Sequence, residues 1–101
     1  MSKNMRDPKR KPTHSGDILR NVVLPALNIT QGEFARHLGV SRLTVSELLL
    51  EKRAMTPDMA IRVGRYTNTT PESRLRMQQS LDIWELERQP HRYRKIEPIV
   101  A

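Results

Sequence analysis

The segment from Thr30 to Val45, together with Leu48, has the pattern of two short helices joined by a tight turn. Gly39 can adopt the left-handed backbone conformation that ends a helix, and Ala35 is small enough for two helices to cross closely. Two helices with so short a connection must pack across each other, so the pattern predicts a helix-turn-helix. The apolar residues that support it recur three or four positions apart on each side of the turn, with one in the turn itself: Phe34, Leu38, Val40, Val45 and Leu48.

Both helices of this pair have their own start signals. Thr30 can cap the first helix, and Glu33 can reach back to complete a capping box. Ser41 can cap the second helix. The same spacing would suit an αα-hairpin without a binding partner, but the glycine, the small residue and the five apolar positions together favour the helix-turn-helix.

Three further helices are expected around this pair. Ser15 can cap a helix that runs to about Leu24, where Pro25 stops or kinks it. Thr56-Pro57-Asp58 and Thr70-Pro71-Glu72 each combine a cap, a proline at the first helical position and a carboxylate. The last helix should end near Gln89. We therefore predict an all-α, five-helix domain over residues 14–89, flanked by a basic flexible arm (1–13) and a basic tail (90–101).

The net charge of +7 is concentrated at the two ends of the chain. Residues 1–13 contain five basic residues against one acidic residue, and residues 88–101 contain four against one, whereas residues 14–87 are neutral. Such tails either neutralise nucleic-acid phosphates or simply keep the protein in solution. An aromatic content of 4% leaves no platform on which single-stranded nucleic acid could stack.

Composition also limits compartment and chemistry. The chain has no cysteine, no apolar run long enough to span a membrane and no apolar core of a signal peptide at its start. We therefore expect a cytoplasmic protein without membrane attachment. The three histidines have no ligand-like spacing, and no glycine-rich phosphate loop is present, so the sequence predicts no enzyme activity, no metal and no cofactor.

In a helix-turn-helix, the second helix reads base edges in the major groove of double-stranded DNA. Arg42, Leu43, Ser46 and Glu47 point away from the predicted core face and would face that groove. Arg42 can donate two hydrogen bonds to guanine, Glu47 can accept one from cytosine N4, and Leu43 can contact a thymine methyl group. Alternatively, Arg42 and Glu47 form an exposed pair on the helix.

Another group of residues is better placed for phosphate contacts than for base contacts. It comprises the polar residues at the two helix starts and the two cations that follow the second helix: Gln31, Ser41, Thr44, Lys52 and Arg53.

The last helix has more apolar surface than one core contact requires. Met77, Leu81 and Trp84 form one row, and Ile83 and Leu86 lie beside it. Either both rows belong to the core, or one row packs against a second copy of the chain. The second alternative predicts a homodimer interface made by Met77, Leu81, Ile83, Trp84 and Leu86.

The stretch from His14 to about Glu87 resembles the HigA family of addiction-module antitoxins, also called virulence-associated protein I. This family lies within the Xre/Cro/C1 (λ-repressor-like) helix-turn-helix group. The matching segments are HSGDILR (14–20), LPAL (24–27), TQGEFARHLGVSRLTVSEL (30–48), KRAMTPDMAIRVGRY (52–66), TTPE (69–72) and LRMQQSLDIW (75–84). The leading His-x-Gly and the trailing Thr-Pro-Glu and Gln…Asp-x-Trp make the resemblance specific.

The resemblance implies a small homodimeric protein that binds and neutralises a HigB-type toxin, an mRNA endonuclease, and represses their shared operon at a palindromic operator. The chain departs from the family in two places. Ser73-Arg74 replaces two aromatic residues, and Leu50-Glu51 replaces Asn-Gly, so that the second helix either runs on or leaves Glu51 strained at its end. The alternatives are a free-standing repressor without a toxin, or a protein-interaction module.

Overall fold

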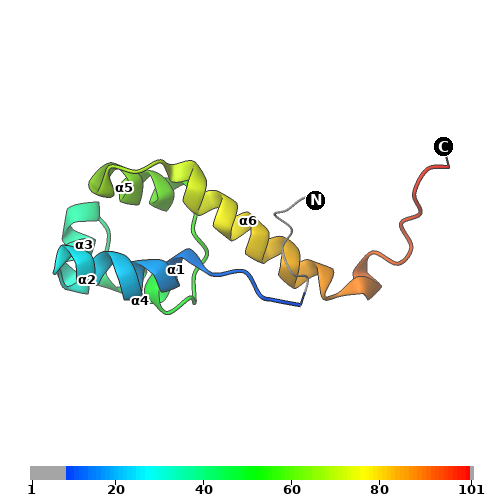
Figure 1. Cartoon of the computed structure of the whole chain (residues 1–101), viewed down its shortest axis with the longest axis horizontal. Coiled ribbons are helices and arrows are strands. Elements are labelled where there is room, and N and C mark those ends of the chain that lie inside the picture. Colours follow the sequence, from blue (N-terminus) through cyan, green and yellow to red (C-terminus); the bar gives the residue numbers. More distant parts are fainter. Residues whose placement is uncertain (1–8, 101) are drawn as a thin grey trace.

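Helices provide all the regular structure in residues 9–100, the part of the chain that the computed structural model describes (Figure 1). The elements are α1 (Ser15–Ile18), a π-helical turn η1 (Leu19–Val23), α2 (Leu24–Leu27), α3 (Gln31–Leu38), α4 (Arg42–Leu49), α5 (Pro57–Thr67), α6 (Pro71–Glu87) and a 3₁₀ turn η2 (Pro90–Arg92). The first three follow one another without a break. The described residues therefore form five helical segments, which confirms the predicted all-α helix-turn-helix fold.

The hydrophobic core lies where α1–α5 come together. Four of the five apolar positions that predicted the helix pair are buried, and Val40 packs against their edge. Burial of each large side chain contributes about 1.5–3 kcal/mol, so this cluster is the main stabilising element of the domain. Its members are Leu19, Leu24, Phe34, Ala35, Leu38, Val45, Leu48, Leu49, Met55, Met59, Ala60 and Val63.

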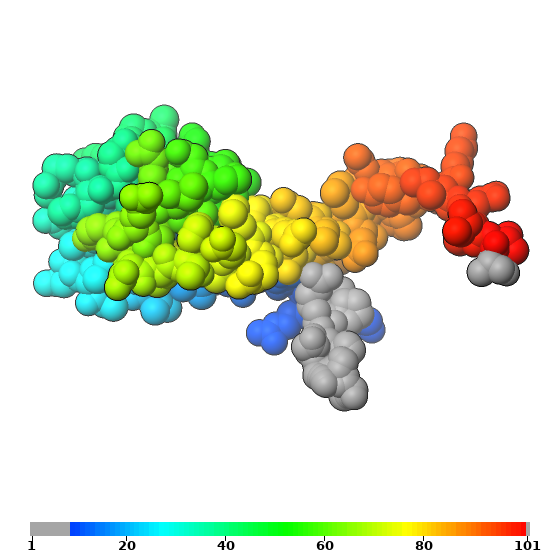
Figure 2. Space-filling view, turned by 90° about the horizontal axis from the view of Figure 1, so that it is seen from above, coloured from blue at the N-terminus to red at the C-terminus, as the bar shows by residue number. Residues whose placement is uncertain are grey.

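The last helix leaves this body and makes the molecule elongated. Its extents are 54 × 30 × 22 Å. Figure 2 shows the body at one end, with the residues after α6 projecting away from it. Residues 93–100 are exposed, and residues 96–100 have no regular structure. The predicted arm lies mostly in residues 1–8, outside the described part of the chain.

Three predicted helix starts have the expected hydrogen bonds. The backbone N–H of Glu33 donates to the Thr30 hydroxyl (3.1 Å), and the Thr30 N–H donates to the Glu33 carboxylate (2.8 Å), which completes the capping box. Hydrogen bonding from the Thr30 backbone lowers the pKa of Glu33. Ser41 caps α4 and Thr56 caps α5 in the same manner.

Of the other two predicted caps, Ser15 was wrong, and Thr70 has the predicted position without the capping hydrogen bond. Ser15 is the first residue of α1, and His14 is its cap, because the His14 Nδ1 accepts a hydrogen bond from the Gly16 N–H (2.9 Å). The buried Ser15 hydroxyl has no hydrogen-bond partner among residues 9–100. Thr70 stands at the cap position of α6, but its side chain accepts no capping hydrogen bond.

Pro25 does not end the first helical segment. The chain continues as α2 to Leu27, and the widened π turn η1 immediately precedes the proline. A proline ring in a regular α-helix clashes with the carbonyl group four residues earlier, and a local π turn relieves that clash. The segment ends at Asn28, which has a left-handed backbone (φ 56°).

Ser73 and Arg74 stand where the resembled family has two aromatic residues. Other contacts attach α6 to the body. A Cβ atom on Gly64 would lie 2.7 Å from the Thr69 carbonyl oxygen, so this glycine allows α5 to approach the start of α6. The buried Gln78 accepts a hydrogen bond from the Met55 N–H (2.8 Å) and donates one to Asp82 (2.8 Å). The Gln and Asp of the family-like pattern therefore have a structural role.

The structure at the end of α4 shows which of the two outcomes expected for Leu50-Glu51 holds. The helix stops at Leu49, and Glu51 has a left-handed backbone with φ 63°. The Glu51 N–H donates to the Leu48 carbonyl and the Lys52 N–H to the Glu47 carbonyl, as in a Schellman motif. Glycine or asparagine occupies the equivalent position at Asn28, Gly39 and Asn68, so Glu51 is the strained member of the set.

Replacement of Glu51 by glycine should stabilise the protein. A left-handed conformation costs a residue with a side chain about 1–2 kcal/mol, so Glu51→Gly should gain about 1 kcal/mol and raise Tm by about 4–8 °C. The matched control is Glu51→Ala, which removes the exposed Arg20–Glu51 ion pair (3.7 Å) but keeps the strain. Equal Tm values for the two variants in thermal denaturation would contradict this account.

Candidate nucleic-acid interface

Helix α4 buries one face and leaves the other uncovered. Val45 and Leu48 are fully buried, whereas Leu43 is 66% exposed and Arg42 is exposed. Ser46 and Glu47 are half-buried at the border between the two faces. The exposed face of α4 therefore presents a cation and an apolar side chain next to each other, at Arg42 and Leu43.

Arg42 lies at the junction between the two helices of the motif. A Cβ atom added to Gly32 would be 3.5 Å from Cδ and Nε of Arg42, so the arginine side chain runs across the backbone at the start of α3. Gln31, the first residue of α3 and the neighbour of Gly32 in the chain, is exposed. The structure thus brings together one predicted base-reading residue and one predicted phosphate-contacting residue.

The start of α4 also presents backbone donors. The Ser41 hydroxyl accepts a hydrogen bond from the Thr44 N–H (3.0 Å) and shares another with the Thr44 hydroxyl (2.9 Å). These two side chains are therefore partly engaged in capping. The first N–H groups of a helix have no partner within that helix, and together with the helix dipole they favour a phosphate at this position.

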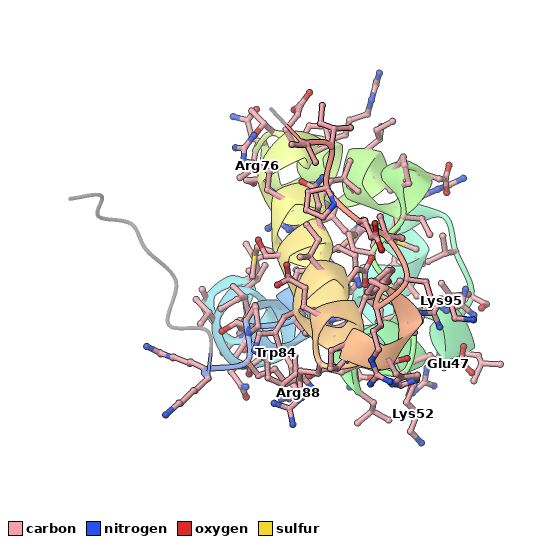
Figure 3. All side chains as sticks on the ribbon, turned by 90° about the vertical axis from the view of Figure 1, so that its right-hand side faces the viewer. Glu47, Lys52, Arg76, Trp84, Arg88 and Lys95 are labelled. Atoms are coloured by element: carbon pink, nitrogen blue, oxygen red, sulfur yellow. The ribbon has the colours of Figure 1, made fainter. Side chains whose placement is uncertain are left out.

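Glu47 is paired with a different residue from Arg42, which the sequence had suggested as an alternative. Its carboxylate Oε1 accepts hydrogen bonds from Arg53 Nη2 (2.6 Å) and Nε (3.2 Å), and it is not paired with Arg42. This pair connects α4, which we call the reader helix, to the loop that follows it. Figure 3 shows Glu47 and Lys52 along the same edge of the molecule, with Arg76 of α6 at the opposite edge.

Three elements hold the end of α4 and the loop that follows it. The His14 Nε2 donates to the Arg53 carbonyl (3.0 Å), Arg20 donates to the Leu49 carbonyl, and Gln78 holds the Met55 N–H. Gly16 allows α1 to approach the last turn of α4, because a Cβ atom there would overlap the Leu48 carbonyl oxygen at 2.1 Å. The His-x-Gly pattern thus places Lys52 and Arg53 relative to the reader helix.

Sequence reasoning missed this positioning role of His14. The His-x-Gly pattern was a usable signal for it. The Glu47–Arg53 pair had no comparable signal, because the two residues are separated by the end of a helix.

The apolar residues of α6 that were predicted to form a dimer interface are exposed to different degrees. Ile83 is 43% exposed and Leu86 is 39% exposed, and Met77 and Trp84 are half-buried. Leu81 is buried within its own chain. The Arg88 guanidinium stacks on the Trp84 ring at 4.6 Å.

Comparison with known proteins places this arrangement in a family. Residues 19–73 match the helix-turn-helix family HTH_3. The chain is 39% identical to an uncharacterised HTH-type transcriptional regulator, YbaQ, of Escherichia coli (strain K12), over 82% of this chain and 74% of that one. It is 35% identical to antitoxin HigA-1 of Vibrio cholerae, over 80% of this chain and 76% of that one.

The chain belongs to the helix-turn-helix family that includes the HigA antitoxins. A solved structure of the Pseudomonas aeruginosa antitoxin HigA with the higBA promoter is similar to it, with a TM-score of 0.81 and 33% identity. That similarity covers 89% of this chain and all of the other. Proteins of this family are transcription regulators and antitoxins, which agrees with the prediction of a protein that is not an enzyme.

Within residues 9–100, no group of three or more histidine or acidic side chains is arranged to hold a metal ion. No helix in that range is long and apolar enough to cross a membrane.

Arg42 provides the most direct test of the interface. Arg42→Ala should lose about 1–3 kcal/mol of binding free energy on the preferred duplex, selected from random DNA, and relax the preference at one base pair. Arg65→Ala is the matched control, because it removes the same charge from an exposed position on α5. Equal weakening on preferred and random duplexes in titrations would make Arg42 a phosphate contact instead.

Proposed function

We propose that this protein is the antitoxin of a HigBA-type toxin–antitoxin module. It neutralises an mRNA-endonuclease toxin by binding it, and it represses its own operon by sequence-specific binding to double-stranded DNA. The observation that carries the proposal is the uncovered face of α4, with Arg42 and Leu43 exposed over a rigid helix pair, in a chain similar to an antitoxin solved with its promoter. The compartment is the cytoplasm, where operon and toxin are found.

The DNA contacts divide into two groups. Arg42, Leu43, Ser46 and Glu47 meet base edges in the major groove, where a bidentate arginine recognises guanine. A second group fixes the phosphates on either side: Gln31, Ser41, Thr44, Lys52 and Arg53.

High specificity requires a second reader helix. One helix spans only a few base pairs, and related proteins place two of them about 34 Å apart on a palindromic site. The exposed apolar residues of α6, Ile83 and Leu86, lie on the element that projects away from the body. A two-fold interface along α6 would bury them, together with Met77 and Trp84, in a homodimer.

The toxin half of the proposal is tested by co-expression with the product of the neighbouring gene. The chain should rescue growth, and Arg42→Ala should keep that rescue while derepressing a promoter reporter, because the two activities use different surfaces. If the purified neighbour does not bind at micromolar concentration, the protein is a free-standing repressor instead.

The dimer is tested by one substitution on α6. Ile83→Asp should convert a dimer to a monomer in analytical ultracentrifugation and lower operator affinity, since one change enters a two-fold interface twice. Ile61→Asp is the matched control, because Ile61 is similarly exposed (46%) but lies on α5. A wild-type chain that sediments as a monomer at micromolar concentration would refute the α6 interface.

A further inference from the structure

The ion pair between Glu47 and Arg53 leaves both groups with capacity for further hydrogen bonds. Arg53 uses Nη2 and Nε on a single carboxylate oxygen, Oε1 of Glu47. No other hydrogen bond to either side chain is found in residues 9–100, so the second oxygen, Oε2, remains available as an acceptor. The guanidinium group likewise keeps its Nη1 hydrogens as donors. The side chains are 36% (Glu47) and 44% (Arg53) exposed, so both reach the surface of the reader helix.

The backbone of Arg53 is fixed as well as its side chain. The His14 Nε2 donates to its carbonyl oxygen (3.0 Å), and the preceding residue donates to the Glu47 carbonyl (2.8 Å). The guanidinium group therefore reaches Glu47 from a backbone that is tied both to α1 and to the last turn of α4. A carboxylate held in this way loses less conformational entropy when it binds a ligand.

We propose that Arg53 is a positioning residue that sets base choice at Glu47. This inference rests on the proposed DNA binding. Oε2 of Glu47 accepts a hydrogen bond from an exocyclic amine in the major groove, on cytosine or adenine. Arg53 holds the carboxylate through Oε1 and donates its remaining N–H groups to the adjacent phosphate. The residue thus connects one phosphate contact to one base contact.

Electrostatics supports this arrangement. A carboxylate on a reader helix lies among phosphates of the same charge, and the repulsion opposes binding unless a cation neutralises it. Arg53 is that cation, since its guanidinium makes a charge-assisted contact of 2.6 Å. Without Arg53, Glu47 should repel DNA of any sequence rather than select a base.

The test is a double-mutant cycle on DNA selected from random duplexes by the wild-type chain. Arg53→Gln should weaken binding to the selected duplex by more than about tenfold, and substantially less in a Glu47→Gln background, because the unneutralised carboxylate is then absent. Selection with Glu47→Gln should lose the preference at one base pair. Arg53→Lys keeps the positive charge without the planar fork, so it should retain most of the affinity and loosen the same base pair.

Lys52→Gln is the matched control. Lys52 is adjacent and exposed, and it makes no ion pair within residues 9–100. Its substitution should weaken selected and random duplexes by the same factor and act independently of Glu47→Gln. All variants should keep the wild-type Tm within a few degrees, because both side chains of the pair lie at the surface.

Two results would overturn the inference in distinguishable ways. If Arg53→Gln costs the same factor in the wild-type and Glu47→Gln backgrounds, Arg53 is a simple phosphate contact, and the proposed DNA binding stands. If the wild-type chain enriches no sequence from the random pool, the proposed DNA-binding function fails, and this inference fails with it.

Discussion

The packing of α3 against α4 determines what the rest of the molecule can do. Phe34 and Leu38 on one helix and Val45 and Leu48 on the other are all buried in the same cluster. The turn between them closes at Gly39, whose φ of 74° suits a glycine and few other residues. Because both helices are held by their buried faces, the opposite face of α4 is rigidly presented, and Arg42 and Leu43 are exposed as a consequence.

The loop after α4 is the point where the other elements control this surface. His14, the cap of α1, donates a hydrogen bond to this loop, and Gln78 of α6 accepts one from it. Arg20 of η1 donates to the Leu49 carbonyl, at the end of α4 where the loop begins. A loop with this many external partners keeps its backbone in place even though Glu51 is strained within it. The cost of that strain is offset by the contacts that hold the backbone at Lys52 and Arg53.

Helix α6 connects the same body to a surface of a different kind. Gly64 of α5 and the Gln78 and Leu81 side chains of α6 anchor it to the body, whereas in its second half Ile83 and Leu86 are exposed. Figure 1 shows this second half beyond the core. A helix that is buried at one end and exposed at the other is suited to joining two copies of the domain. This physical feature underlies the proposed dimer.

Local chemistry was enough to predict the elements and most of their ends from the sequence. The capping box at Thr30, the caps at Ser41 and Thr56 and the left-handed Gly39 depend on residues within a few positions of one another. The same holds for the helical spacing of the core. Strain at Glu51 was foreseen as one of two outcomes, because a missing glycine at a helix end is also a local matter.

Contacts across the fold were decided only by the tertiary structure. Ser15 looked like a cap from its neighbours, but the His14 ring takes that place because it also reaches the Arg53 carbonyl, which is distant in sequence. Glu47 was expected to act alone or with Arg42, yet the chain reversal after α4 brings Arg53 to it. Sequence spacing specifies which residues share a helix face, whereas the partners of a side chain depend on how separate elements meet in space.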